Sequence, residues 1–168
     1  MLHKPTLAAF ILCSMLTFQL FAKTITDEKS NVSIDLPDAD GWTITDGKTA
    51  GEKSTTAAHA DGVSIIVLRF ERTLPAVVMK RLADTLSPII TDAKAAEDGT
   101  DQVSLHGLQA DKITGSASKD EKPLRFTAVL VATGNNSTLA VIAFGPETNF
   151  KRHLRDIDAA IGSVRPGH

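Results

Sequence analysis

The sequence predicts an α+β domain, an α/β/α sandwich in which a mainly antiparallel central sheet carries one helix on each face. Three observations predict this fold. Short turns join most of the expected strands, which is typical of antiparallel pairing. The segment 63–70 is apolar at successive positions, so both faces of that strand must be covered. Two amphipathic helices are present to cover them.

The N-terminal segment has the layout of a secretion signal. Lys4 precedes an apolar run over 7–21, and the small residue Ala22 follows it. The run is about 15 residues long, shorter than the roughly 20 that a membrane-spanning helix needs. We therefore expect residues 1–22 to be a cleavable signal peptide and residues 23–168 to be a single domain, exported to the bacterial periplasm.

Composition excludes several classes of chemistry from the expected mature domain. The only cysteine, Cys13, lies inside the apolar run and follows Leu12 rather than a small residue, so lipid anchoring is not expected. A domain without cysteine has no disulfides and no thiolate chemistry. The formal net charge is −2 and no basic tract occurs, which disfavours nucleic acid and anionic membrane surfaces as partners. After cleavage we do not expect the chain to span a membrane.

The first expected strands follow directly after the signal. Apolar and polar residues alternate over 32–36 and again over 42–45, which is typical of half-buried strands. Asp46-Gly47 is a common hairpin turn, so we expect these two strands to be neighbours. The polar segment 48–53 predicts a loop, and 54–59 predicts a weak strand.

A helical period replaces the strand period near Thr73. Pro75 suits the first position of a helix, and apolar residues recur at Val78, Leu82 and Leu86. Ser87-Pro88 is expected to end or kink this helix, because a proline disfavours helical angles in the residue before it. The acidic, alanine-rich segment 91–101 predicts a loop.

The second half of the chain predicts three more strands and a closing helix. The strands cover 103–118, with a break at His106-Gly107, then 124–133 and 138–144. Gly134 and two asparagines tolerate the positive φ angles of a hairpin turn between the last two strands. The closing helix, which ends at Gly162, places four apolar residues on its buried face: Phe150, Leu154, Ile157 and Ile161.

Several short segments resemble the PsbP-like fold family. They are Val-Ser-Ile-Asp-Leu-Pro at 32–37 with Gly41-Trp42 after it, Leu-His-Gly-Leu-Gln-Ala at 105–110, and the closing helix over 150–164. The family includes photosystem extrinsic subunits, a Ran-binding nuclear import factor and bacterial DcrB-like envelope proteins. The resemblance implies an antiparallel α/β/α sandwich that binds partners or supports assemblies without catalysis. It lies in scaffold positions, so it assigns no functional residue.

No motif for catalysis or metal binding is apparent. His59, His106 and His153 lack the H-x-H or H-x-x-x-H spacings of a local metal site, so we expect structural or surface roles and no cofactor or metal. His153 follows Arg152 and is expected on the exposed side of the last helix. Neither G-x-S-x-G nor a glycine-rich phosphate loop occurs, so no catalytic residue is assigned. A hydrolase assembled from distant residues would be favoured by a structure that places His59 or His106 in a pocket, within hydrogen-bond reach of a serine or carboxylate.

The candidate partner-binding residues are aromatic and basic. Trp42, the single tryptophan, is expected to cover an edge of the core, and Lys151, Arg152 and Arg155 form a basic cluster that suits an acidic partner. The sequence therefore predicts a non-enzymatic periplasmic binding or accessory protein that acts through another protein of the cell envelope. Three alternatives remain open: a toxin-neutralising immunity protein, a lipid or small-ligand carrier, and the hydrolase.

Overall fold

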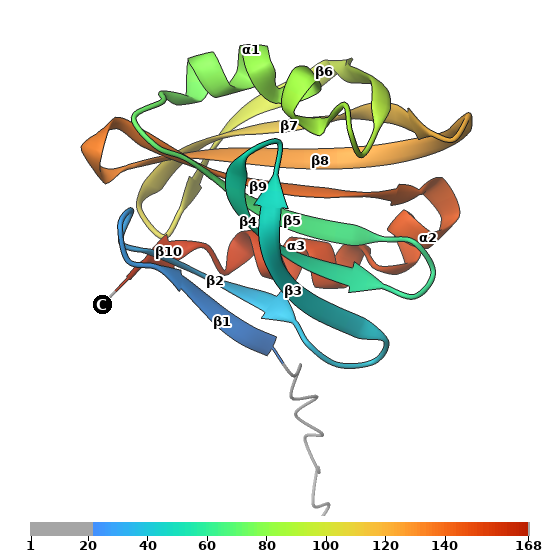
Figure 1. Ribbon diagram of the computed structural model, residues 1–168, viewed down its shortest axis with the longest axis horizontal. Helices are drawn as coiled ribbons and strands as arrows, with labels where there is room; N and C mark the ends of the chain where they lie inside the picture. The colour runs from blue at the N-terminus through green and yellow to red at the C-terminus, as the bar shows by residue number, and fades with distance from the viewer. Residues whose placement is uncertain (1–21, 168) are drawn as a thin grey trace, which may run out of the picture.

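The computed structural model describes residues 22–167, and its main feature is a curved sheet of seven strands (Figure 1). Every neighbouring pair in this sheet is antiparallel, as predicted. In spatial order the strands are β3 (Trp42–Thr49), β4 (Glu52–His59), β5 (Ser64–Phe70), β9 (Ser137–Pro146), β8 (Lys122–Thr133), β7 (Leu108–Lys119) and β6 (Thr91–Leu105).

A second, smaller sheet contains the strands nearest the two ends of the described chain. Its order is β1 (Ala22–Asp27), β2 (Val32–Pro37) and β10 (Arg165–Pro166), with β2 antiparallel to both neighbours. The expected pairing of β2 with β3 is therefore wrong, because β2 pairs with β1 and β10 while β3 pairs with β4. Asp46-Gly47 lies inside β3, and the hairpin turn is at Ala50-Gly51, whose φ angles of 49° and 86° suit it.

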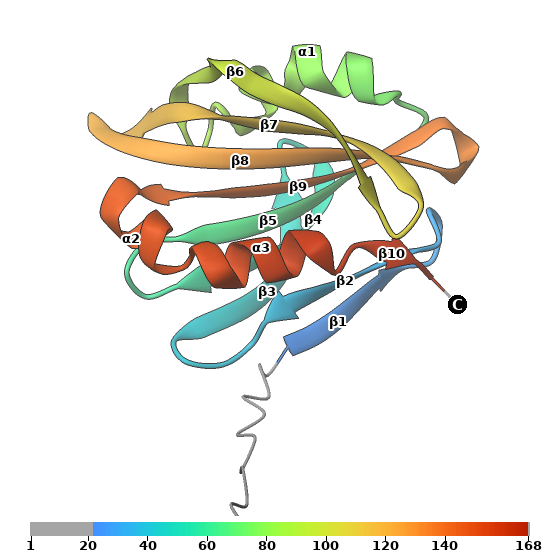
Figure 2. The ribbon, with the colours of Figure 1, turned by 180° about the vertical axis from the view of Figure 1, so that it is seen from behind.

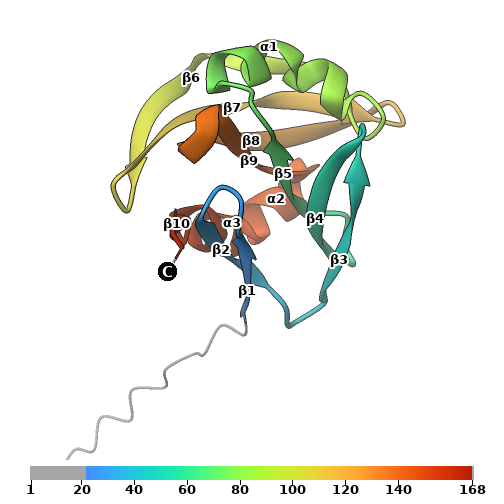
Figure 3. The ribbon, with the colours of Figure 1, turned by 60° about the vertical axis from the view of Figure 1, so that its left-hand side comes forward.

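Helices cover the large sheet on both faces, but not one on each. Helix α1 (Pro75–Leu86) covers one face through its predicted apolar positions. The other face is covered by α2 (Glu147–Arg152), by α3 (Leu154–Gly162) and by the small sheet. Figure 2 shows α2 and α3 lying across this face with β2 alongside α3, and Figure 3 shows the large sheet curving around them. The α+β class holds, whereas a single helix on each face is not confirmed.

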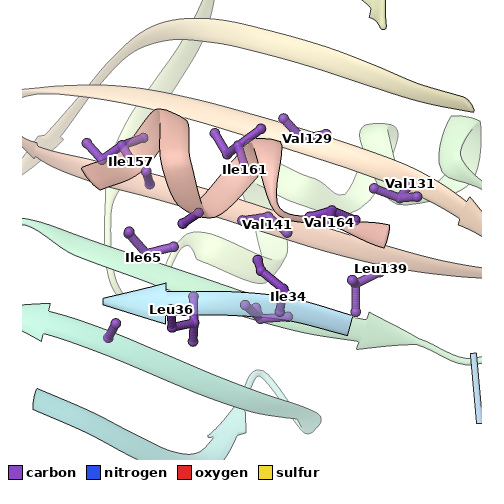
Figure 4. Packing of buried hydrophobic residues seen from close by; sticks show 14 of the residues in the cluster. Ile34, Leu36, Ile65, Val129, Val131, Leu139, Val141, Ile157, Ile161 and Val164 are labelled. Carbon is purple, nitrogen blue, oxygen red and sulfur yellow. The ribbon is translucent and has the colours of Figure 1, made fainter. Parts of the chain in front are cut away.

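The core between the sheet, α3 and β2 is closely packed (Figure 4). Its side chains converge from three layers, and those with 2% exposure or less include Ile34, Leu36, Ile65, Val129, Val131, Val141, Ile157 and Val164. On the opposite face, Ile66 is 3% exposed and Leu130 is fully buried, so the predicted burial of both sheet faces is confirmed.

Four segments differ from the sequence-based expectation. The segment 48–53, expected to be a loop, is strand except for the turn at Ala50-Gly51, and no strand was expected where β1 lies. The segment 91–101, expected to be a loop, belongs to β6, an edge strand whose residues are mostly exposed and whose register shifts twice. An exposed, irregular edge has no apolar alternation that would reveal it. The single closing helix is divided at His153 into α2 and α3.

The predicted signal peptide lies outside the described residues except for Ala22, the first residue of β1. Within residues 22–167, no helix is both long enough and apolar enough to cross a membrane.

Candidate histidine and carboxylate site

Three aromatic rings meet where β3 begins, β4 ends and α2 gives way to α3. Trp42 and His59 are register partners on β3 and β4, and their ring centroids are 5.3 Å apart. The centroid of His153 lies 5.5 Å from that of Trp42 and 4.1 Å from that of His59. Asp61 joins the two imidazoles, and we call His59, Asp61 and His153 the His-Asp cluster.

The turn between β4 and β5 places Asp61 against His59. The His59 backbone N–H donates to the carbonyl of Val63 (2.8 Å), and the Gly62 N–H donates to the carbonyl of His59 (3.0 Å). This tight turn brings Asp61 Oδ1 to 2.8 Å from His59 Nδ1. On the other side of the ring, His59 Nε2 lies 2.9 Å from the carbonyl of Asp40. A Cβ atom on Gly41 would lie only 2.7 Å from this Nε2, so the position has no room for a side chain.

The break between α2 and α3 turns His153 toward the same carboxylate. His153 has φ −96° and ψ 12°, outside helical geometry, although its N–H still donates to the carbonyl of Asn149 (3.0 Å). Its Nε2 lies 3.0 Å from Asp61 Oδ2, and its Nδ1 lies 3.2 Å from Asp156 Oδ2. The side chain is 12% exposed, so the expected position on the exposed side of a helix is wrong.

Hydrogen bonding keeps Asp61 ionised. Burial by itself raises the pKa of Asp61, but the hydrogen bonds and positive charge of His59 and His153 outweigh it, so the pKa lies below its ordinary value. Arg152 Nη1 adds a longer contact of 3.4 Å to Oδ2. The amide of Asn149 donates to the backbone carbonyl of Asp61 (2.9 Å), which fixes the turn against α2.

The structure brings some of the predicted partner-binding residues together and separates others. Trp42 is 8% exposed and covers the edge of the core, as expected, so it lies beneath the surface. Arg152 reaches the His-Asp cluster through Asp61, whereas Lys151 pairs with Glu147 (2.9 Å). Arg155 is exposed and makes no ion pair within residues 22–167.

Sequence reasoning missed the meeting of two histidines. His106 lies elsewhere, with its Nε2 3.0 Å from the carbonyl of Gly162. The local signal in the sequence was His59 two residues before Asp61. The H-x-H and H-x-x-x-H motifs do not include this spacing, so a search for them does not detect it. The pairing of Asp61 with His153 spans 92 residues and depends on the fold.

One condition set for the hydrolase alternative is met. His59 lies within hydrogen-bond reach of a carboxylate, and it borders a groove of about 520 Å³ beside Gly62 and Pro146. Both nitrogens of His59 are engaged, one with Asp61 and one with the carbonyl of Asp40. Among the hydrogen bonds of residues 22–167, the partners of these two histidines are carboxylates and backbone groups, with no hydroxyl group.

Comparison with known proteins identifies the fold. No protein-family model and no curated protein matches the sequence. Among solved structures, cyanobacterial PsbP (CyanoP) from Synechocystis sp. PCC 6803 aligns with a TM-score of 0.60 over 86% of this chain and 92% of its own, at 14% identity. The chain has a PsbP-like fold.

Two further structures share the PsbP-like fold. LpqN of Mycobacterium tuberculosis, described as involved in cell envelope biogenesis, aligns with a TM-score of 0.57 and 16% identity over 86% of this chain and 90% of its own. A Pseudomonas aeruginosa protein of unknown function aligns with a TM-score of 0.50 and 13% identity over 84% of this chain and 94% of its own. None of the three is described as an enzyme. Identities this low establish a shared fold and carry over no site.

Proposed function

We propose that this protein is a non-enzymatic accessory protein of the bacterial cell envelope that resides in the periplasm. We further propose that it binds an acidic protein partner through the exposed side of α2 and α3. The signal-like segment 1–22 supports export, and the cell-envelope role given for LpqN supports the compartment. The basic cluster supports an acidic partner.

The exposed side chain of Leu154 is the main reason for placing the partner-binding surface on α2 and α3. Leu154 is 44% exposed at the start of α3, whereas Ile157 and Ile161 on the same helix are buried. Three exposed cationic side chains lie next to it in sequence on α2 and α3. We call Lys151, Arg152, Leu154 and Arg155 the basic patch. An apolar contact with a charged rim has the composition of a protein interface.

The basic patch adjoins the His-Asp cluster through Arg152. The Arg152 guanidinium lies 3.4 Å from Asp61 Oδ2, and the side chain is 63% exposed. The main rival is the start of α1, where Leu74 is 53% and Val77 is 40% exposed but, unlike Leu154, neither is next to a basic residue in sequence.

Site-specific photo-crosslinking in cells separates these surfaces. A photoreactive residue is placed at Leu154 on the basic patch, at Val77 on α1, and at exposed Gln102 on β6 as the control. We expect a discrete crosslinked protein from position 154 alone. Charge reversal by Arg155→Glu should diminish that product, because an acidic partner is then repelled.

The matched charge control is Lys80→Glu on the exposed side of α1, which should leave the product unchanged. Crosslinking from position 77 but not 154 would overturn the choice of surface. Recovery of no crosslinked protein from any position would overturn partner binding itself.

Hydrolysis is the second candidate, because His59 contacts Asp61 beside a groove. A general base needs a free nitrogen to accept a proton, but Nδ1 of His59 contacts the carboxylate and the backbone N–H of Asp61, and Nε2 contacts the carbonyl of Asp40. We therefore expect chromogenic ester and phosphoester substrates to be hydrolysed no faster by the wild-type protein than by His59→Gln. Turnover that His59→Gln abolishes would reverse the order of the two candidates.

A further inference from the structure

We propose that His59, Asp61 and His153 form a binding site for one divalent transition-metal ion of the zinc type. Arg152 belongs to the basic patch and also contacts Asp61, so the two proposals share this side chain, but each has its own test. Its three ligand groups each offer one atom, and these atoms lie within 4.8 Å of one another. Two imidazoles and one carboxylate are a common zinc ligand set, which leaves a fourth position for water.

The spacing of the ligand atoms fits such an ion. Ligands at about 2.0–2.1 Å from a tetrahedral zinc ion are roughly 3.3 Å from one another. In the structure His59 Nδ1 is 2.8 Å from Asp61 Oδ1, and His153 Nε2 is 3.0 Å from Asp61 Oδ2. These two distances run to different oxygens of the Asp61 carboxylate, and the three ligand atoms lie within 4.8 Å of one another, so side-chain rotations must bring them to the ion.

The far nitrogen of each imidazole has the partner that metal-bound histidines require. Histidine ligands normally donate their other N–H to a carbonyl or a carboxylate, which fixes the tautomer and the ring orientation. His59 Nε2 faces the carbonyl of Asp40 at 2.9 Å, and His153 Nδ1 faces the carboxylate of Asp156 at 3.2 Å. With those nitrogens protonated, the lone pairs of His59 Nδ1 and His153 Nε2 point toward Asp61.

The surroundings hold the ligands in place. The side chains of His59, Asp61 and His153 are 15%, 21% and 12% exposed, and Trp42 packs edge-on against both rings. Among residues 22–167, the cationic side chain that contacts Asp61 and opposes a metal is that of Arg152, at 3.4 Å from Oδ2. Its side chain is 63% exposed and is free to turn toward solvent when an ion occupies the site.

The test uses Zn²⁺ alone with the tag-free protein, in competition with a chromophoric chelator. Trp42, the only tryptophan, gives a second readout, because both ligand rings touch its indole. We expect one ion per chain and a change in tryptophan emission that ends at the same stoichiometry. Asp61→Asn and His153→Gln should each weaken binding at least tenfold.

Two further variants separate coordination from general effects on the fold. His106→Gln removes a histidine outside the cluster, so we expect it to bind Zn²⁺ like the wild type. Asp156→Asn keeps all three ligands and alters only the group behind His153, so we expect an affinity loss of about tenfold or more. Circular dichroism checks that each variant is folded. Unchanged binding by folded Asp61→Asn, or equal losses in His106→Gln and His153→Gln, would overturn the site.

Discussion

Gly145 on β9 has no room for a side chain. A Cβ atom there would lie 2.9 Å from Val63 Cγ2 and 3.0 Å from Val63 Cα, whereas carbon atoms in good contact are about 3.5–4.0 Å apart. Both residues are buried, and β9 is paired with β5 and β8, so neither backbone can withdraw freely. Overpacking of this kind costs about 1–3 kcal/mol, and we expect Gly145→Ala to lower the free energy of unfolding by about 2 kcal/mol.

Urea unfolding followed by circular dichroism measures this loss. The matched control is Gly162→Ala at the end of α3, where a new Cβ would meet no atom within 4 Å, and we expect it to lose no stability. Val63 also accepts the backbone hydrogen bond of His59, so displacement of Val63 should weaken Zn²⁺ binding although every ligand is intact. If Gly145→Ala unfolds at the wild-type urea concentration, the close approach of β9 to Val63 is wrong.

Two other predictions concern the core edge and the small sheet. Trp42→Ala should lower the free energy of unfolding by about 3–5 kcal/mol, and Trp42→Phe by clearly less, because phenylalanine keeps part of the ring packing; equal losses by circular dichroism would contradict this. The hydrogen bond from Arg165 lowers the pKa of Asp35, although burial opposes this effect. The ionised pair therefore stabilises the folded protein above about pH 4, the ordinary pKa of an aspartate in the unfolded chain. This stability is lost as the pH falls through the lower pKa of the folded state. The urea midpoint of Arg165→Gln should therefore lie below that of the wild type at pH 6, and the gap should shrink in acid to what the hydrogen bond from Arg165 to the carbonyl of Ser163 contributes. A gap of the same size at both pH values would refute the assignment.

The elements with a strong apolar period were predictable from the sequence. Helix α1 begins at Pro75 and ends at Leu86, and the hairpin of β8 and β9 turns at Gly134, all as expected. In these elements the buried face requires apolar residues at fixed intervals, so the spacing of apolar residues predicts it. The edge strands β1 and β6 bury few side chains, so their sequences show no such spacing.

Strand pairing was less predictable than strand position. The segment of β2 was correct, but its partners β1 and β10 come from opposite ends of the described chain. The same limit hid the His-Asp cluster. His153 reaches Asp61 only because β9 pairs with β5 and delivers α2 to the β4–β5 turn, and no local spacing encodes that path.

The break between α2 and α3 at His153 affects both the basic patch and the His-Asp cluster. A continuous helix would bury Leu154 with Ile157 and expose His153, which the apolar spacing predicts. The structure reverses the two: Leu154 is 44% exposed, and the His153 side chain is 12% exposed. Full burial of a leucine side chain contributes about 1.5–3 kcal/mol to the free energy of unfolding, and Leu154 loses much of this contribution because it is partly exposed. Sites where a structure forgoes the arrangement that would stabilise it best are expected to be functional, because selection for stability alone would remove them. The exchange leaves Leu154 exposed, where we propose that a partner binds, and it gives Asp61 its second imidazole. The break in the helix is therefore the feature that brings His153 to the His-Asp cluster.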